Sequence, residues 1–100
     1  MITGYNLSAH LINERMDRLE HIANTIGFGD IKYKKYYSAR NCIQAITDTG
    51  VLCILDEAGT TIITMYPLTI TKAKAIFKEH IPDSLYKTLR KNLKNKYITE

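Results

Sequence analysis

The three histidines are the side chains of this sequence best suited to acid–base chemistry near neutral pH. His10 and His21 fall eleven residues apart within one predicted helix, and His80 stands alone. Eleven residues make about three turns, so the two imidazoles share an azimuth but lie roughly 16 Å apart, too far to bind one metal ion. The spacing therefore predicts no metal site and leaves the histidines as proton-transfer groups or as solvated surface residues.

Other polar side chains have the types that metal-independent cleavage of RNA requires. That reaction needs a base for the 2′-hydroxyl proton, cations beside the phosphorane and a donor near the leaving oxygen. The sequence offers these groups as His10, Arg15 or Arg18, Arg40, Thr64 and Tyr66. It contains no Walker, GxGxxG, HExxH, DxD or GxSxG motif, so nucleotide-driven, zinc-dependent and serine-hydrolase chemistries have no support and no cofactor is predicted.

Positive charge is unevenly distributed along the chain. The net charge of +4 comes from 14 Lys and Arg against 10 Asp and Glu, and residues 71–100 alone hold eight basic against three acidic residues. A second cluster interleaves lysines with tyrosines between Lys32 and Arg40, which combines phosphate attraction with base stacking. The predicted nucleic-acid-binding residues are Lys32, Lys34, Lys35, Tyr36, Arg40, Lys87, Arg90, Lys91 and Lys94. Lysines that only keep the protein soluble are the competing interpretation.

An amphipathic helix is predicted over residues 8–26. Its apolar residues recur at spacings of three and four, which is typical of one buried stripe: Leu11, Ile12, Met16, Leu19, Ile22, Ala23 and Ile26. Ser8 is the expected N-cap and Gly27 the expected stop. His10 and His21 lie on the opposite, polar face, which is either solvated or functional.

Three strands of an antiparallel meander are predicted over residues 41–66. The strands are Asn41–Thr47, Val51–Asp56 and Thr60–Tyr66, and two short hairpin loops separate them. A tight turn at Thr49-Gly50 would place Asp48 opposite Val51, and the same register pairs Cys42 with Glu57. In the third strand, Ile62, Thr64 and Tyr66 are expected to share one face.

The whole chain is predicted to be a single α+β domain over residues 1–100, in which the first helix packs on the meander. Residues 31–40 show neither a helical nor a strand period and are interpreted as an irregular connector. If residues 31–37 are extended, they form a fourth strand of the sheet. Two basic helices are predicted at 71–79 and 83–94. The length and composition suit one hydrophobic core without disulfides or metals.

The two cysteines, Cys42 and Cys53, indicate the redox environment. The predicted register does not pair them, and no CxxC spacing is present, so neither a disulfide nor a zinc site is expected. No apolar run reaches the roughly 18 to 20 residues of a membrane span. We therefore expect a reducing cytoplasm, that of the bacterial host if the chain is encoded by a phage.

The order of these elements carries a resemblance. S-A-H-L-I-N-E-R-M, which contains His10 and Arg15, is followed by I-T-D-T-G-V-L-C-I-L-D (residues 46–56) and T-T-I-I-T-M-Y-P (residues 60–67). Over about residues 8–77 this pattern resembles the small phage and toxin nucleases of the barnase–EndoU–colicin–RelE-like superfamily. The resemblance implies a metal-independent ribonuclease whose site lies on the sheet face opposite the helix. It implies His10, Arg15, Thr64 and Tyr66 as catalytic residues, and it also fits an inactive relative that only binds.

Two classes of function stay open at this point. The first is a ribonuclease-like or RNA-binding domain, with RNA or another nucleic acid as partner. The second is a small phage-encoded protein without enzymatic activity, which inhibits or regulates a host protein; a cognate inhibitor protein is a further expected partner. A sequence-specific DNA binder ranks below both, because the helix at 83–94 lacks a helix-turn-helix partner with a glycine-containing turn.

Overall fold

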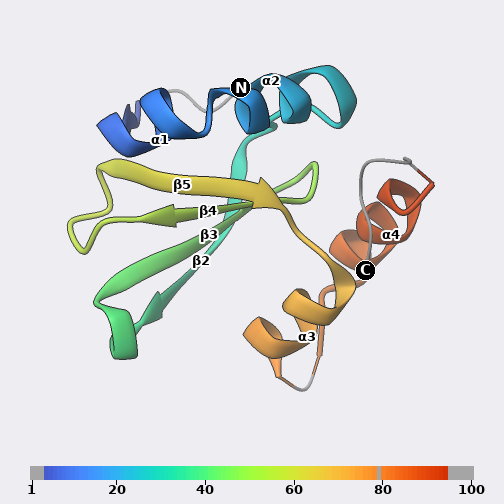
Figure 1. Cartoon of the computed structure of the whole chain (residues 1–100). Coiled ribbons are helices and arrows are strands. Elements are labelled where there is room, and N and C mark those ends of the chain that lie inside the picture. The colour runs from blue at the N-terminus through green and yellow to red at the C-terminus, as the bar shows by residue number, and fades with distance from the viewer. Residues whose placement is uncertain (1–3, 79, 95–100) are drawn as a thin grey trace.

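The computed structural model describes residues 4–78 and 80–94, which form an α+β structure around one five-stranded mixed sheet. The strand order is β1-β5-β4-β3-β2. The strands are β1 (Asn6–Leu7), β2 (Ile31–Tyr37), β3 (Cys42–Thr47), β4 (Val51–Leu55) and β5 (Thr61–Pro67). Helices α1 (Ala9–Glu14) and α2 (Met16–Thr25) lie on one side of the sheet, and α3 (Ile70–Phe77) and α4 (Asp83–Asn92) lie on the other (Figure 1).

The predicted helix over 8–26 is divided in two at Arg15, whose φ of −129° and ψ of 21° leave the helical region. Ser8 caps α1 as predicted, because its Oγ accepts a hydrogen bond of 3.1 Å from the Leu11 amide. The break changes which residues are buried. Leu11, Leu19 and Ile22 are packed in the core, whereas Ile12 and Met16 of the predicted stripe are 42% and 43% exposed. The prediction of one continuous stripe was therefore wrong.

The sheet has five strands, so the predicted count of three or four was too low. The segment 31–37, interpreted from the sequence as part of an irregular connector, is strand β2 and pairs antiparallel with β3. At the other edge, β1 runs parallel to β5 and pairs only with Thr61 and Ile62. A two-residue strand has no period that a sequence pattern can reveal, which explains why β1 was missed.

The β3–β4 hairpin differs from the predicted register by one residue. Ala45 lies opposite Cys53 and Ile46 opposite Leu52. The loop is longer than the tight turn that we expected, because Gly50 has a φ of +91° and its amide donates to the Thr47 carbonyl. Cys42 and Cys53 are free and buried.

Each face of the sheet packs against one pair of helices, and strand alternation assigns residues to a face except at irregularities in β2 and beside Leu55. The α2 face carries Ala45, Val51, Cys53, Leu55, Ile62 and Met65, which pack with Leu11, Leu19 and Ile22. The α3 face carries Ile46 and Leu52, which pack with Leu68, Ala73, Ile76, Leu85 and Leu89. An irregularity beside Leu55 moves Ile62 to the α2 face, away from Thr64 and Tyr66, so the expectation that the three share a face was wrong for Ile62.

Helices α3 and α4 begin and end close to the predicted limits. Thr69 caps α3, because its Oγ1 atom accepts a hydrogen bond of 3.1 Å from the Lys72 amide. This cap explains why the helix begins one residue before the predicted position. Residue 79, the predicted end of that helix, lies outside the described residues. Helix α4 ends at Asn92, and the backbone tightens into a turn at Lys94. Within the described parts of the chain, no helix is both long and apolar enough to cross a bilayer.

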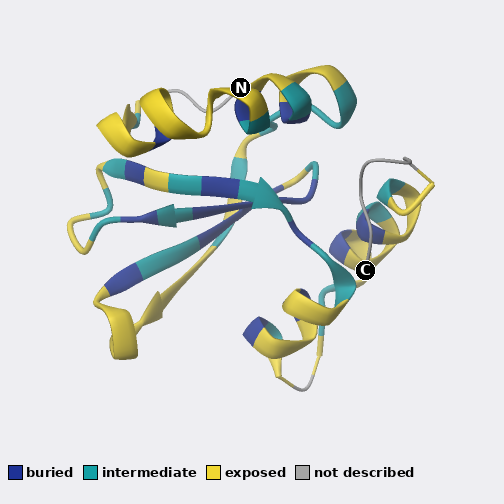
Figure 2. Ribbon diagram, viewed as in Figure 1, coloured by how far each residue is buried: buried dark blue, intermediate teal, exposed yellow. Residues whose placement is uncertain are grey.

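Burial differs between the strands. Figure 2 shows the buried residues concentrated in β3, β4 and β5, whereas most of β2 is exposed. Strand β2 is an edge strand that carries three lysines, and charged residues at a sheet edge discourage pairing with other chains. The sheet therefore has one open, basic edge.

Candidate nucleic-acid interface

The sheet separates the four predicted catalytic residues into two pairs. His10 and Arg15 belong to the helical layer over the α2 face. Thr64 and Tyr66 lie opposite Ile54 and Leu52, which places them on the α3 face. The structure therefore brings Thr64 and Tyr66 to one surface, and it does not bring His10 or Arg15 to that surface.

The partners of His10 and Arg15 lie within α1, whereas Tyr66 has a partner on α2, from the other layer. The Nδ1 atom of His10 lies 2.7 Å from a carboxylate oxygen of Glu14 on an exposed part of α1. Arg15 donates to the backbone carbonyl of Glu14. The cation that reaches Tyr66 is Arg18, whose guanidinium carbon lies 5.9 Å from the centre of the phenol ring.

Tyr66 is partly buried, and this environment shifts the pKa of its phenol. Burial raises the pKa of Tyr66 above its ordinary value of 10.0, and the charge of Arg18 opposes that shift. The phenol is therefore protonated near neutral pH. In that state it can donate a hydrogen bond, but it is a weak base.

The basic segment 32–40 is divided by strand alternation in the same way. Lys34 lies opposite Ala45 on the α2 face, and its ammonium stands 5.5 Å from the ring centre of Tyr5. Tyr36, also on that face, donates a hydrogen bond of 3.2 Å to the Asn41 side chain. Lys35 lies opposite Gln44 on the α3 face. Strand alternation therefore assigns neighbouring residues of the predicted cluster to opposite faces, although Tyr36 and Lys34 of this edge strand still line the hollows beside α3.

The remaining predicted residues of this segment occupy different places. Lys32 lies at the start of β2, near Asp48 and Ser84 of a small recess. Arg40 ends the short 3-10 turn Ser38–Arg40 between β2 and β3, and its side chain is exposed. Tyr33, which accompanies them in the sequence, packs edge-on against Phe77 with ring centres 5.8 Å apart, so its main role is in the core.

Lys35 connects β2 to α3. Its ammonium donates a 3.0 Å hydrogen bond to the Ile76 carbonyl in the last turn of α3, and it lies 5.9 Å from the ring centre of Phe77. A cation at the C-terminal end of a helix satisfies an orphan carbonyl and interacts favourably with the helix dipole. Lys35 therefore holds α3 beside the edge strand and leaves a groove between the two elements.

This β2–α3 groove has a volume of about 360 Å³. Residues of β2, β3 and α3, with the cap residue after α3, line it, among them Lys35, Tyr36, Tyr37, Gln44, Lys72, Ile76 and Lys78. A second hollow of similar size continues it along β2 and shares Lys35, Gln44 and Ile76. No carboxylate is found among the described residues that line either hollow. The groove is therefore a site of positive potential with two exposed tyrosine side chains, Tyr36 and Tyr37, in its lining.

Lys72 and Lys78 were missed as site residues, although they contribute to the basic excess of the C-terminal third. A helical wheel shows which residues of α3 share a face, but it does not show that this face meets β2. The exposed ring of Tyr37 was also not assigned, because the period of residues 31–37 is masked by consecutive polar residues. Only the β2–β3 register places Tyr37 on the α3 face, opposite Cys42.

A row of side chains crosses the α3 face beside the groove. Thr64, Ile54, Gln44 and Lys35 are direct neighbours on β5, β4, β3 and β2. All four are partly or fully exposed, whereas Ile46 and Leu52 of the next row are buried under α3 and α4. The predicted strand residue Thr64 therefore shares an open surface with the groove.

The basic residues of α4 form a separate surface. Lys87, Arg90, Lys91 and Lys94 are exposed, whereas Leu85 and Leu89 face the core. Arg90 stacks near Tyr86, with 5.9 Å between its guanidinium carbon and the ring centre. None of these four cations lines the β2–α3 groove. They can add long-range attraction for an anion, but they do not shape the groove.

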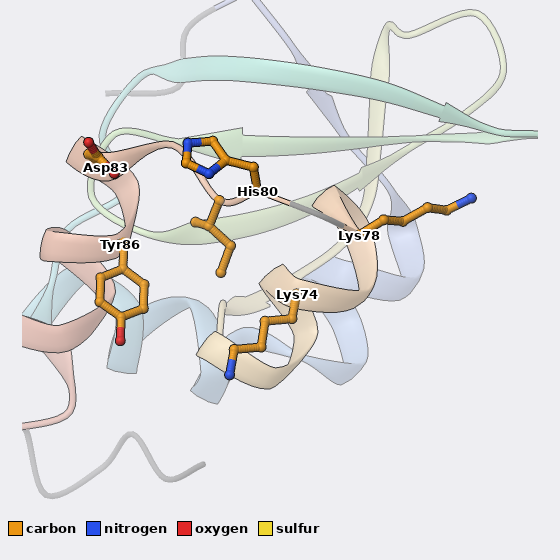
Figure 3. A pocket seen from close by; sticks show the side chains of 6 residues that line it. Lys74, Lys78, His80, Asp83 and Tyr86 are labelled. Carbon is orange, nitrogen blue, oxygen red and sulfur yellow. The ribbon is translucent and has the colours of Figure 1, made fainter.

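A further pocket lies between α3 and α4 (Figure 3). Lys74, Lys78, His80, Asp83 and Tyr86 are among its lining residues. In Figure 3, the Lys78 side chain points away from His80 and Asp83, so the cations do not converge, and Asp83 adds a negative charge. This pocket is less suited to a phosphate than the groove. Within the described residues, no group of three His, Cys, Asp or Glu side chains is placed to hold a metal ion.

Comparison of the chain with protein-family models, with curated proteins and with solved structures gives no match. The function is therefore inferred from the geometry of the residues described above.

Proposed function

We propose that this chain is a ribonuclease-like RNA-binding domain that holds single-stranded RNA in the β2–α3 groove. The observation that carries the proposal is the composition of the groove. Lys35, Lys72 and Lys78 come from two segments far apart in the sequence, and the described lining residues include no carboxylate. Such a groove attracts the phosphate backbone of a nucleic acid and releases counterions from it.

Tyr37 supports a single strand rather than a duplex as the ligand. Its side chain is 43% exposed at the rim of the groove. Unpaired bases stack on such rings, and each stacked base contributes about 1–3 kcal/mol by alanine substitution. Sequence-specific recognition of RNA also uses unpaired bases that stack on aromatic side chains. A lysine-lined groove with exposed tyrosine rings, those of Tyr36 and Tyr37, has both components.

The position of the groove agrees with the resemblance to the barnase–EndoU–colicin–RelE-like nucleases. That resemblance implies a site on the sheet face opposite the leading helix, and the groove lies on the α3 face, opposite α1 and α2. Strand β2 also brings the sheet above three strands, and the superfamily usually has four or more. Both features support an RNA-directed function without assigning a reaction.

We propose binding rather than cleavage as the activity of this surface. Metal-independent cleavage needs a base beside the 2′-hydroxyl group. No histidine is found among the described residues that line the groove, and His10 lies in the layer over the opposite face. Tyr66 keeps its proton near neutral pH, since the ordinary pKa of 10.0 already lies well above 7 and burial raises the pKa further. Cleavage of total bacterial RNA in EDTA by the wild type, absent in His10→Ala, would contradict this part of the proposal.

A matched pair of lysine variants on α3 tests the RNA-binding surface. Lys72 lines the groove, whereas Lys74 lines the pocket toward α4 instead. Two residues correspond to about 200° around a helix, so the two side chains leave α3 in different directions. Lys72→Gln and Lys74→Gln remove the same charge from the same helix. Their comparison separates a local contact from the effect of net charge.

The affinity for a fluorescent single-stranded RNA would be measured by anisotropy over a series of salt concentrations. Removal of one lysine–phosphate interaction makes the slope of log K against log salt shallower by about 0.7 for a single strand. We expect that change, and roughly fivefold weaker binding near 0.1 M salt, in Lys72→Gln only. Equal effects in both variants would assign binding to net charge, and no salt-dependent binding by the wild type would refute the proposed function.

A further inference from the structure

Gln44 lies at the centre of the open surface on the α3 face. It stands on β3 between Lys35 of β2 and Ile54 of β4, and it lines both hollows along β2. Its side chain is partly buried. Within residues 4–78 and 80–94, no protein group hydrogen-bonds to its side-chain amide. The floor of the groove therefore presents one amide whose hydrogen-bonding groups are available to a ligand.

The neighbours of Gln44 limit which ligand that amide can receive. An amide offers a carbonyl acceptor and two N–H donors in one plane. The edge of adenine offers a matching pair, the N6 amino donor and the N7 acceptor, and glutamine binds this pair through two hydrogen bonds. The cations around Gln44 suit the phosphate attached to such a base: Lys35, Lys72 and Lys78 all line the same groove.

Tyr37 supplies the third component of a base site. It lies on the same sheet face as Gln44, because Tyr37 pairs with Cys42 and Lys35 pairs with Gln44. An exposed ring there can stack on the plane of a base whose edge meets Gln44. The groove volume of about 360 Å³ falls in the range of small-ligand sites and can hold one nucleotide.

We propose that Gln44 recognises adenine in single-stranded RNA, with the base stacked on Tyr37 and the adjacent phosphates held by Lys72 and Lys78. This inference rests on the proposed RNA-binding function and adds a base preference to it. The lysines set the affinity for any sequence, and Gln44 sets the difference between adenine and the other bases. A free adenine nucleotide has the same base and phosphate chemistry, so the test must separate it from RNA.

The test compares labelled oligoadenylate, oligocytidylate and oligouridylate, each about ten nucleotides long. Binding would be measured for the wild type, for Gln44→Leu and for a control, Asn24→Leu, which makes the same amide-to-apolar change on an exposed position of α2. Two well-aligned hydrogen bonds give at least about fivefold discrimination between bases. We expect the wild type and Asn24→Leu to prefer adenine by that factor or more.

Gln44→Leu should bind all three RNAs with nearly equal affinity and with the salt dependence of the wild type. If Gln44→Leu keeps the adenine preference, stacking alone explains it and the inference is wrong. Tight RNA binding without any base preference in the wild type also overturns the inference, while the proposed function stands. Absence of RNA binding by the wild type overturns both.

Competition with adenosine monophosphate identifies the source of the base. One nucleotide brings a single phosphate to a groove with three lysines, so we expect it to displace oligoadenylate only at a large excess. Displacement at equal nucleotide concentration would show that a free nucleotide is the ligand, and it would overturn the assignment to RNA. A circular dichroism melt of each variant establishes that it is folded.

Discussion

The two helical layers of this protein cover opposite faces of one sheet, but they differ in charge and in how completely they cover it. Residues 9–25, which contain α1 and α2, hold three carboxylates and two arginines, for a net charge of −1. Residues 70–94, which contain α3 and α4, hold seven basic and two acidic residues, for a net charge of +5. Each layer buries an apolar stripe, so patterning alone gives no reason to prefer one face.

The two faces of the sheet differ in how many of their residues the helices bury. On the α2 face, the core residues of β3 and β4 from Ala45 to Leu55 are buried under α1 and α2. On the α3 face, Ile46 and Leu52 are buried, but Gln44, Ile54 and Thr64 of the neighbouring row are partly exposed. The basic layer therefore leaves a row across β3, β4 and β5 accessible beside its lysines, and this row can contact a ligand, whereas the residues buried under α1 and α2 cannot.

The largest expected effect comes from opening the core on either face. Leu11 on α1 and Leu89 on α4 are almost completely buried, so Leu11→Ala and Leu89→Ala should each lower the free energy of unfolding by about 2–5 kcal/mol. Urea denaturation measures this. RNA affinity per folded molecule should be unchanged in Leu11→Ala. A large loss of affinity in that variant, while it is still folded, would remove the distinction between the faces.

An intermediate effect is expected from adjacent lysines of β2 that face opposite sides. Lys35→Ala should lower the free energy of unfolding by about 1 kcal/mol, because the Ile76 carbonyl loses its charged donor. It should also weaken RNA binding, since Lys35 lines the groove. Lys34→Ala should change the free energy of unfolding much less, because its ammonium lies beside the Tyr5 ring and not at a helix carbonyl, and it should weaken RNA binding less, because Lys34 lines the second hollow and not the groove itself. If Lys34→Ala and Lys35→Ala had equal effects on urea denaturation and on RNA binding, the two lysines would not have the different roles that strand alternation assigns to them.

The smallest expected effect belongs to the β4–β5 turn, which lies outside both helical layers. Backbone amides of Thr61 and Thr60 donate to the Asp56 carboxylate and lower its pKa below the ordinary value of 3.8. The folded pKa is below the unfolded one, so this stabilisation is present above the unfolded pKa and is lost as pH falls through the folded pKa. Asp56→Asn should therefore destabilise the protein at neutral pH and flatten the acid limb of its stability profile.

Urea midpoints between neutral pH and about pH 2 measure this effect for both proteins. The RNA affinity of Asp56→Asn at neutral pH serves as the control, and it should equal that of the wild type. An acid limb as steep in the variant as in the wild type would contradict the role of Asp56.

The sequence predicted the local elements more successfully than their assembly. The cap at Ser8, the hairpin sequences and the start of the last helix at Asp83 follow from short-range chemistry, and short patterns reveal them. The division at Arg15 and the register of the β3–β4 hairpin depend on a few backbone angles. A change of one residue in register transfers side chains to the other face, as happened for our pairing of Cys42 with Glu57.

The candidate site was predicted only in part, for the same reason. The segment 32–40 reads as one basic and aromatic cluster, but β2 distributes Lys34 and Lys35 to opposite faces. Lys72 joins the site because α3 packs beside β2, which is a contact between distant segments. Sequence reasoning can find residues of the right type, but convergence of His10 with Thr64 requires a tertiary arrangement that local patterns do not specify.

The most direct test of the account is an amide chemical-shift map of the full chain during titration with single-stranded oligoadenylate. We expect the largest shifts in β2 and the turn Ser38–Arg40, at Gln44, and in α3, with little change in α1 and α2. Shifts centred on α1 and α2 around His10, or distributed evenly over all exposed lysines, would contradict the assignment of RNA binding to the β2–α3 groove.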